Sequence, residues 1–204
     1  MTDHPRRLIV GISGSSAPQL GLAVLRALRE VPGMETHLVV SRGATRSIAA
    51  EMGDGAEREF AALADVTYEP DNLAAAIASG SFRTAGMVVV PCSMRTLAAV
   101  ATGNTGDLLS RAADVCLKER RRLVLVARET PLNLIHIRNM ETVTLAGGVI
   151  MPPVPAFYHR PATIDDLLQH TAGKVLDLFG IEHSLFRRWE GLPAESVRGC
   201  GASS

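Results

Sequence analysis

Small and hydroxyl-bearing residues follow the first strand-like segment of the sequence, where a phosphate could bind. Residues 8–21 read LIVGISGSSAPQLG, an apolar run followed by Gly14, Ser15 and Ser16 and then by a helical pattern. Small side chains let backbone N–H groups approach a ligand, and a helix start offers unpaired N–H groups and a positive dipole end. Ser13 adds a third hydroxyl donor. The segment predicts a site for an anion such as a phosphate monoester, although a merely tight turn uses the same residue types.

This turn does not match the common nucleotide or hydrolase motifs. It lacks the GxGxxG spacing, and no GK[ST] follows as in a Walker A loop. The glycines at positions 11 and 14 are also spaced wrongly for a GxSxG nucleophile elbow. The chemistry expected here is therefore phosphate binding by backbone and hydroxyl groups.

Other strand ends carry polar residues as well. The segment VVVPCSMRT at 88–96 is an apolar run that ends in small and hydroxyl residues before a helix. The carboxyl ends of parallel strands open on one edge of a sheet, so these side chains should share a crevice with Ser16. Any one serine or threonine could simply cap a helix. Four polar strand ends together favour a site, made of Ser16, Ser41, Ser93, Arg95, Thr96, Arg128 and Glu129.

Strand and helix patterns alternate along the chain. Short apolar runs predict buried strands at 8–12, 37–40, 87–90, 123–126 and 148–151. Helical patterns fall at 18–30, 44–51, 73–79, 96–101, 108–117, 132–145 and 163–179. Alternating β and α elements predict a doubly wound parallel sheet with right-handed crossovers, a three-layer α/β/α fold of flavodoxin-like or Rossmann-like type. We expect one domain over residues 1–191 and a flexible, small and polar tail over 192–204.

Composition narrows the function classes. Of 204 residues, 47% are hydrophobic, and 21 basic residues balance 21 acidic ones, which disfavours a broad surface for nucleic acid or an anionic membrane. No apolar run reaches the ~18 residues of a membrane helix, and the first apolar run is too short for a signal peptide. The three cysteines form no CxxC pair, and the histidines show no metal-ligand spacing. We expect a cytoplasmic protein without a metal site, with Cys92 and Cys116 in the core.

The segment 108–122 carries charges of two kinds. Arg111 and Lys118 are seven positions apart and share a face of the predicted helix. The arginines at 120–122 suit the negative end of a helix dipole and are expected to be solvated.

Taken together, the motifs resemble one family, the UbiX-type flavin prenyltransferases, including those encoded beside phenolic acid decarboxylases. The resemblance runs from residue 8 to about 191. It rests on GISGSSAPQLG, ETHLVVSRGA (35–44), SGSFRTAGMVVVPCSMRTLA (79–98), RAADVCLKERRRLVLVARETPL (111–132), GGVIMPPVPAFYHRP (147–161) and RRWEG (187–191). It implies a flavodoxin-like dodecamer that joins a dimethylallyl group from dimethylallyl phosphate to N5 and C6 of reduced FMN. The product, prenylated FMN, then serves a separate UbiD-type decarboxylase.

The resemblance also implies roles for individual residues. The FMN-binding set would be Gly14, Ser15, Ser16, Ser41, Ser93, Met94, Arg95, Thr96 and Arg128. Tyr158 and Lys174 would hold the prenyl phosphate, with Arg111 and Lys118 contributed by a neighbouring subunit, and Trp189 would lie close to the allyl pocket. The catalytic set would be Ser16, Glu51, Glu129 and Lys118, the two carboxylates lying near the reacting flavin.

Two departures from the family pattern concern the first turn and the later strand end. The turn usually reads GASGA or GATGA, whereas here Ser15 replaces alanine and Ala17 replaces glycine. Ser16 keeps the hydroxyl position, so we expect phosphate binding to survive. Arg95 stands where lysine is frequent and keeps the charge.

Two other functions fit the same fold. A flavin-dependent cysteine decarboxylase would carry a PASANT-like stretch, where this chain has PCSMRT at 91–96, and would lack the KERR segment at 118–121. A non-catalytic FMN-binding accessory subunit of a decarboxylase would not need Lys118, Arg128, Glu129, Tyr158 and Lys174 together.

Overall fold

The computed structural model describes residues 6–191, and the tail predicted to be flexible at 192–204 lies outside them. Its strands are β1 (Arg6–Ile12), β2 (Met34–Val40), β3 (Val66–Tyr68), β4 (Gly86–Cys92), β5 (Arg122–Ala127) and β6 (Val149–Ile150). The helices are α1 (Gln19–Arg29), α2 (Arg42–Met52), α3 (Glu57–Leu63), α4 (Met94–Thr102), α5 (Leu108–Lys118), α6 (Leu134–Leu145) and α7 (Ile164–Leu178). A short 3₁₀ turn, η1, spans Ala76–Ala78.

The strands form one parallel sheet in the order β3-β2-β1-β4-β5-β6. The predicted doubly wound fold is confirmed, and its strand order is the one of the Rossmann type. The direction of winding reverses between β1 and β4, and ligands of such sheets bind beyond the carboxyl ends of the strands at this point. The first turn and the turn after β4 therefore meet where the topology predicts a site.

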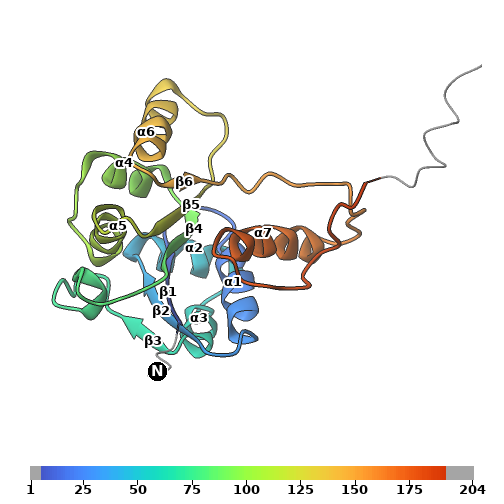
Figure 1. Cartoon of the computed structure of the whole chain (residues 1–204), viewed down its shortest axis with the longest axis horizontal. Coiled ribbons are helices and arrows are strands. Elements are labelled where there is room, and N and C mark those ends of the chain that lie inside the picture. Colours follow the sequence, from blue (N-terminus) through green and yellow to red (C-terminus); the bar gives the residue numbers. More distant parts are fainter. Residues whose placement is uncertain (1–5, 192–204) are drawn as a thin grey trace, which may run out of the picture.

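Helices flank the sheet on both faces (Figure 1), and each face has its own hydrophobic core. Alternate residues of a strand point to opposite faces, so Val10 packs in one core and its neighbour Ile9 in the other. The first core joins the sheet to residues of α1, α2, α3 and α7, and the second joins it to η1, α4, α5 and α6. Because β4 is buried along its whole length, its sequence is continuously apolar rather than alternating.

Residues 53–79 differ from the sequence prediction. The helix expected at 73–79 is only the 3₁₀ turn η1, because Leu73 stays 51% exposed while Ile77 is buried against α5. Strand β3 and helix α3 were not predicted. β3 is a three-residue edge strand, too short to show a period, and α3 buries only Phe60.

After β6 the chain leaves the sheet as an extended proline-containing segment and returns through α7, which packs along α1 (Figure 1). We call residues 152–191 the C-terminal arm. Tyr158, Lys174 and Trp189 belong to it, whereas the other predicted site residues belong to the sheet and its helices. Within the described residues, none of the helices has the length and apolar character needed to cross a membrane.

Candidate functional site

The first turn and the start of α2 are in direct backbone contact. A Cβ atom on Gly14 would lie 2.8 Å from the carbonyl carbon of Gly43, so only glycine fits at position 14. Ser41 caps α2 by accepting a hydrogen bond from Ala44 N–H, and its own N–H donates to the Ile12 carbonyl over 2.9 Å. Position 14 therefore needs glycine because the backbone of the first turn meets the backbone of the turn after β2. The N–H groups of both turns lie at the carboxyl edge of the sheet.

The turn after β4 forms the second wall of this edge. Ser93 caps α4, its hydroxyl accepting from Thr96 N–H at 3.3 Å and donating to the Thr96 hydroxyl at 3.2 Å. Met94 is half-buried and Arg95 is exposed in the first turn of the helix. The start of α4 therefore presents a capped helix N-terminus, with a cation beside it, at this edge of the sheet.

The serines of the first turn have different partners. Ser13, 1% exposed, donates its hydroxyl to the Pro91 carbonyl over 3.1 Å and accepts from Ser93 N–H over 2.7 Å. Ser15 donates its hydroxyl to the Arg128 carbonyl over 3.1 Å. For Ser16, no hydrogen-bond partner of its hydroxyl is found among residues 6–191. The expectation that Ser13 offers its hydroxyl to a ligand is wrong, because that hydroxyl joins β1 to the β4 turn.

Ala17 ends the turn in the left-handed region, at φ 67°. Its N–H donates to Oε2 of Glu51, at the end of α2, over 3.0 Å. Alanine in this conformation is strained by its Cβ, whereas the glycine usual in the family pattern would not be. The Glu51 carboxylate is therefore fixed beside the turn by the residue that departs from that pattern.

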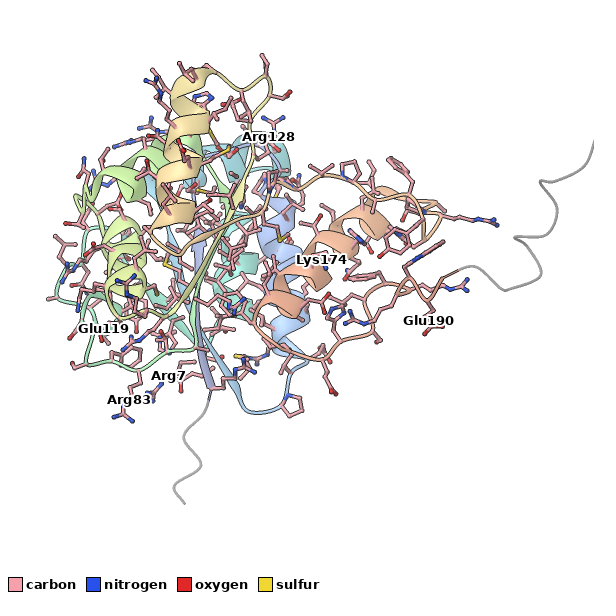
Figure 2. All side chains as sticks on the ribbon, turned by 45° about the horizontal axis from the view of Figure 1, so that its top comes forward. Arg7, Arg83, Glu119, Arg128, Lys174 and Glu190 are labelled. Carbon is pink, nitrogen blue, oxygen red and sulfur yellow. The ribbon has the colours of Figure 1, made fainter. Side chains whose placement is uncertain are left out.

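Arg128, which is labelled in Figure 2, follows β5 at the same edge, and Glu129 is the next residue of the chain. The Arg128 N–H donates to the Cys92 carbonyl over 3.1 Å, so the β5 end is attached to the β4 end. Arg128 is partly buried, and Glu129 is exposed with its carboxylate accepting from Thr130 N–H. The residues predicted to bind FMN thus lie on or beside the turns at one edge of the sheet. They are Gly14, Ser15, Ser16, Ser41, Ser93, Met94, Arg95, Thr96 and Arg128. Glu129 follows Arg128 there, and Glu51 is joined to the first turn by its bond to Ala17 N–H.

These groups fit the phosphate of a mononucleotide. Gly14 lets the first turn pack against the start of α2, α4 supplies a helix N-terminus and Arg128 supplies a positive charge. A phosphate monoester is recognised by this combination of N–H donors and a guanidinium.

The arm residues form an aromatic and basic cluster of their own. The Tyr158 hydroxyl lies 3.4 Å from Nε2 of His170, and Trp189 packs edge-on against the Tyr158 ring with centroids 6.0 Å apart. His170 stacks on His159 with ring centroids 4.9 Å apart. Lys174 follows His170 by one helical turn and pairs with Asp177 at 3.5 Å. The arm therefore brings a phenol, a cation and an aromatic wall to one region.

Burial lowers the pKa of His170 below its ordinary value, and the nearby His159 and Lys174 lower the pKa further. The neutral ring can accept a hydrogen bond from Tyr158. The sequence did not predict the contact of His170 with Tyr158, because the histidines were considered only as metal ligands. The signal that could have found it is its position one helical turn before Lys174.

Arg111 and Lys118 do not join either group within one chain. Arg111 donates from Nε to the Ala78 carbonyl and pairs with Asp114 at 2.9 Å. Lys118 ends α5 and pairs with Glu119, which Figure 2 shows at the far side of the sheet from Arg128. A site that uses Lys118 beside Arg128 therefore needs a second copy of the chain.

The cysteines Cys92 and Cys116 lie in the core, as predicted. Burial raises the pKa of both thiols to about 12. Neither is a thiolate nucleophile at neutral pH.

A doubly wound sheet with phosphate-binding turns at its switch point defines a mononucleotide-binding α/β protein. The family model described as Flavoprotein matches residues 1–176. The chain is 53% identical over 188 residues to flavin prenyltransferase UbiX of Escherichia coli strain K12, covering 91% of this chain and 99% of that protein.

Solved structures give the same result. AnUbiX (PadA1), in complex with FMN and dimethylallyl pyrophosphate, superposes with a TM-score of 0.88 at 52% identity, covering 92% of this chain and 99% of that one. The dodecameric FMN-dependent UbiX-like decarboxylase of Escherichia coli O157:H7 superposes with a TM-score of 0.87 at 51% identity, covering 91% and 100%. The chain belongs to the Flavoprotein family and, within it, to the UbiX-type flavin prenyltransferases.

Proposed function

We propose that this chain is a flavin prenyltransferase that joins the dimethylallyl group of dimethylallyl phosphate to N5 and C6 of reduced FMN. The observation that carries this function is the 53% identity to flavin prenyltransferase UbiX over 188 residues, in a chain whose polar turns meet at one edge of the sheet. Reduced FMN, when bound, supplies the nucleophile. Its prenylated form would leave the enzyme as the cofactor of a UbiD-type decarboxylase.

The carboxyl edge of the sheet would hold FMN. Backbone N–H groups of the first turn, the Ser16 hydroxyl and the start of α4 would bind the phosphate there, and Arg128 would add positive charge. Ser15 contributes backbone rather than hydroxyl, because its hydroxyl donates to the Arg128 carbonyl. The close approach of Gly14 to Gly43 supports this assignment, since it leaves the turn free of side-chain bulk.

The prenyl phosphate would be held by cations from two chains. Breaking the allylic C–O bond places positive charge on the allyl group and negative charge on the departing phosphate. Tyr158 and Lys174 of one chain, with Arg111 and Lys118 of a neighbour, would stabilise the phosphate oxygens as they gain charge. Trp189 would exclude water and present a ring face to the allyl cation.

The second bond would join flavin C6 to one carbon of the prenyl double bond, while the other carbon takes up a proton and C6 gives one up. Glu129 and Ser16 both lie at the FMN edge and can accept a proton there, as can the released phosphate. Glu51 is placed at the same edge by its bond to Ala17 N–H and would act near the reacting ring.

The two-chain site fits an oligomer, and we propose a homododecamer like the relative from Escherichia coli O157:H7. Helix α6 carries apolar side chains that a monomer leaves in solvent, with Leu134 59%, Ile135 67% and Leu145 82% exposed. Residues 1–191 would form the single domain of each subunit. The cytoplasm suits an enzyme with buried free thiols whose product serves another enzyme.

The test is an incubation of the purified protein with reduced FMN and dimethylallyl phosphate without oxygen, followed by mass spectrometry of the flavin. We expect an adduct heavier by one prenyl unit. A parallel reaction with dimethylallyl diphosphate identifies the donor. If neither donor gives the adduct, the proposed function is wrong, and release of carbon dioxide from a cysteine-terminated peptide would favour the cysteine decarboxylase instead.

Glu129→Gln sharpens this test. The amide keeps the size of the side chain but cannot accept a proton as a carboxylate does. The variant should bind FMN as tightly as the original chain and form the adduct more slowly. Equal rates would remove Glu129 from the mechanism.

A further inference from the structure

The ladder between β1 and β4 stops before the two phosphate-facing turns begin. Its paired residues end at Gly11 and Val89, and the pairing of β4 with its other neighbour, β5, shifts register between Val89 and Cys92. Pro91 lies in this interval and has no N–H to donate. The regular pairing of β1 with β4 therefore does not extend to the first turn and the start of α4, and one further backbone bond, from Ser13 N–H to the Pro91 carbonyl, joins the two strand ends.

Ser13 bridges this gap. Its N–H donates to the Pro91 carbonyl over 3.2 Å, and its hydroxyl donates to the same carbonyl over 3.1 Å. The hydroxyl also accepts from Ser93 N–H over 2.7 Å, and Ser93 is the cap of α4. One buried side chain thus acts as donor and acceptor where the proline interrupts the backbone pairing.

We infer that Ser13 is a positioning residue for the phosphate site: its hydroxyl holds the first turn and the α4 N-terminus at the spacing that one phosphate can bridge. This inference rests on the proposed function for the identity of the ligand, FMN. Ser13 does not touch the ligand in this account. It acts through Gly14 and Ser16 on one side and through Ser93 and Thr96 on the other.

The experiment compares Ser13→Ala with Ser13→Thr and with a control at the other edge of the sheet. Thr36 is an equally buried hydroxyl, 2% exposed, which donates to Asp65 Oδ2 over 3.0 Å and accepts from Asp65 N–H over 3.2 Å. It ties β2 to the start of β3, away from the turns. Thr36→Val removes this hydroxyl with the same loss of a donor and an acceptor.

Two readouts are needed, the dissociation constant for FMN and amide hydrogen exchange of residues 91–97 in the FMN-free protein. Ser13→Ala should weaken FMN binding by about tenfold or more, because Ser93 N–H loses its partner, and should speed exchange at 91–97. Ser13→Thr should restore both. Thr36→Val should lower the thermal midpoint and leave both readouts unchanged.

The inference is overturned if Ser13→Ala binds FMN and exchanges like the original chain, or if Thr36→Val changes both readouts equally. If Ser13→Ala does not fold, Ser13→Cys takes its place, since a thiol is a weaker donor and acceptor. If the original chain binds no FMN or forms no adduct, the proposed function fails, and hydrogen exchange at 91–97 alone then decides the role of Ser13.

Discussion

The turns at the carboxyl edge of the sheet and the C-terminal arm hold their predicted site residues in different ways. At the edge, hydroxyl and backbone bonds tie each turn to the next, such as Ser13 to Ser93 and Ser15 to the Arg128 carbonyl. In the arm, Tyr158 and Trp189 are 43% and 60% exposed and touch mainly other aromatic rings. The edge residues are thus joined by hydrogen bonds within one chain, whereas the exposed arm residues are the ones that we propose a neighbouring subunit completes.

The largest expected effect is that of a substitution that impairs binding of the prenyl phosphate without impairing binding of FMN. Lys118→Ala should lower kcat/KM for the prenyl donor by about a hundredfold or more, because the departing phosphate loses a cation. The FMN dissociation constant should not change, because Lys118 pairs with Glu119, which lies far from Arg128 within the chain (Figure 2). Arg122→Ala, which removes an exposed cation nearby at the start of β5, is the control and should be neutral. Weakened FMN binding in Lys118→Ala would contradict the assignment of Lys118 to the prenyl phosphate alone.

A second comparison lies within the first turn. Ser16→Ala should weaken FMN binding by about tenfold, since a hydroxyl bond to a charged phosphate is lost. Ser15→Ala should weaken it by less than about threefold, because its hydroxyl bonds only to the Arg128 carbonyl. Titration of each variant with FMN measures both constants. A larger effect at Ser15 than at Ser16 would reverse these assignments.

A substitution at Ala17, the strained residue at the end of the first turn, should have a smaller effect and should stabilise the fold. Ala17→Gly should raise the free energy of unfolding by about 1 kcal/mol or less, because glycine adopts a φ of 67° without the Cβ penalty. The bond from the residue 17 N–H to Glu51 remains available in this variant. Chemical denaturation measures the change. Destabilisation by Ala17→Gly would contradict the assignment of strain to this residue.

The smallest expected effect concerns pH and the arm. The pKa of His170 is lower in the folded chain than its ordinary value of 6.5. The neutral form of His170 therefore contributes to the free energy of unfolding at pH values above 6.5. This contribution is lost as the pH falls from 6.5 through the lower pKa of the folded chain. The charged or titratable groups around it are His159, Lys174, Asp177 and Tyr158.

Fluorescence reports this change, because Trp189 is the single tryptophan of the sequence and packs against Tyr158. Its emission should shift as the pH is lowered below about 6.5, and the shift should shrink in His170→Phe. An identical shift in that variant would assign the pH dependence to another group.

The sequence predicted most of the fold because buried parallel strands and amphipathic helices leave clear periods. The edge strand β3 and helix α3 escaped prediction, since one has three residues and the other buries only Phe60. The polar strand ends also correctly predicted that these residues meet at one edge, because parallel strands share a carboxyl edge.

Hydroxyl partners could not be predicted from the same pattern. Ser13, Ser15 and Ser16 look alike in sequence, yet Ser13 pairs with Pro91 and Ser93 and Ser15 pairs with a carbonyl 113 residues away. Spacing within the chain does not encode which hydroxyl faces the ligand. The position of Lys118 relative to Arg128 depends likewise on assembly, which a single sequence does not describe.

A mixed oligomer tests most directly that the site is divided between chains. Lys118→Ala impairs the part of the proposed site that holds the prenyl phosphate, and Glu129→Gln impairs the part beside FMN. Oligomers of the two variants are dissociated, mixed and reassembled. The adduct formed with reduced FMN and dimethylallyl phosphate is then measured by mass spectrometry. Partial recovery above either variant alone is predicted, because some sites then combine an intact Lys118 from one chain with an intact Glu129 from another. No recovery in a properly reassembled mixture would contradict a shared site.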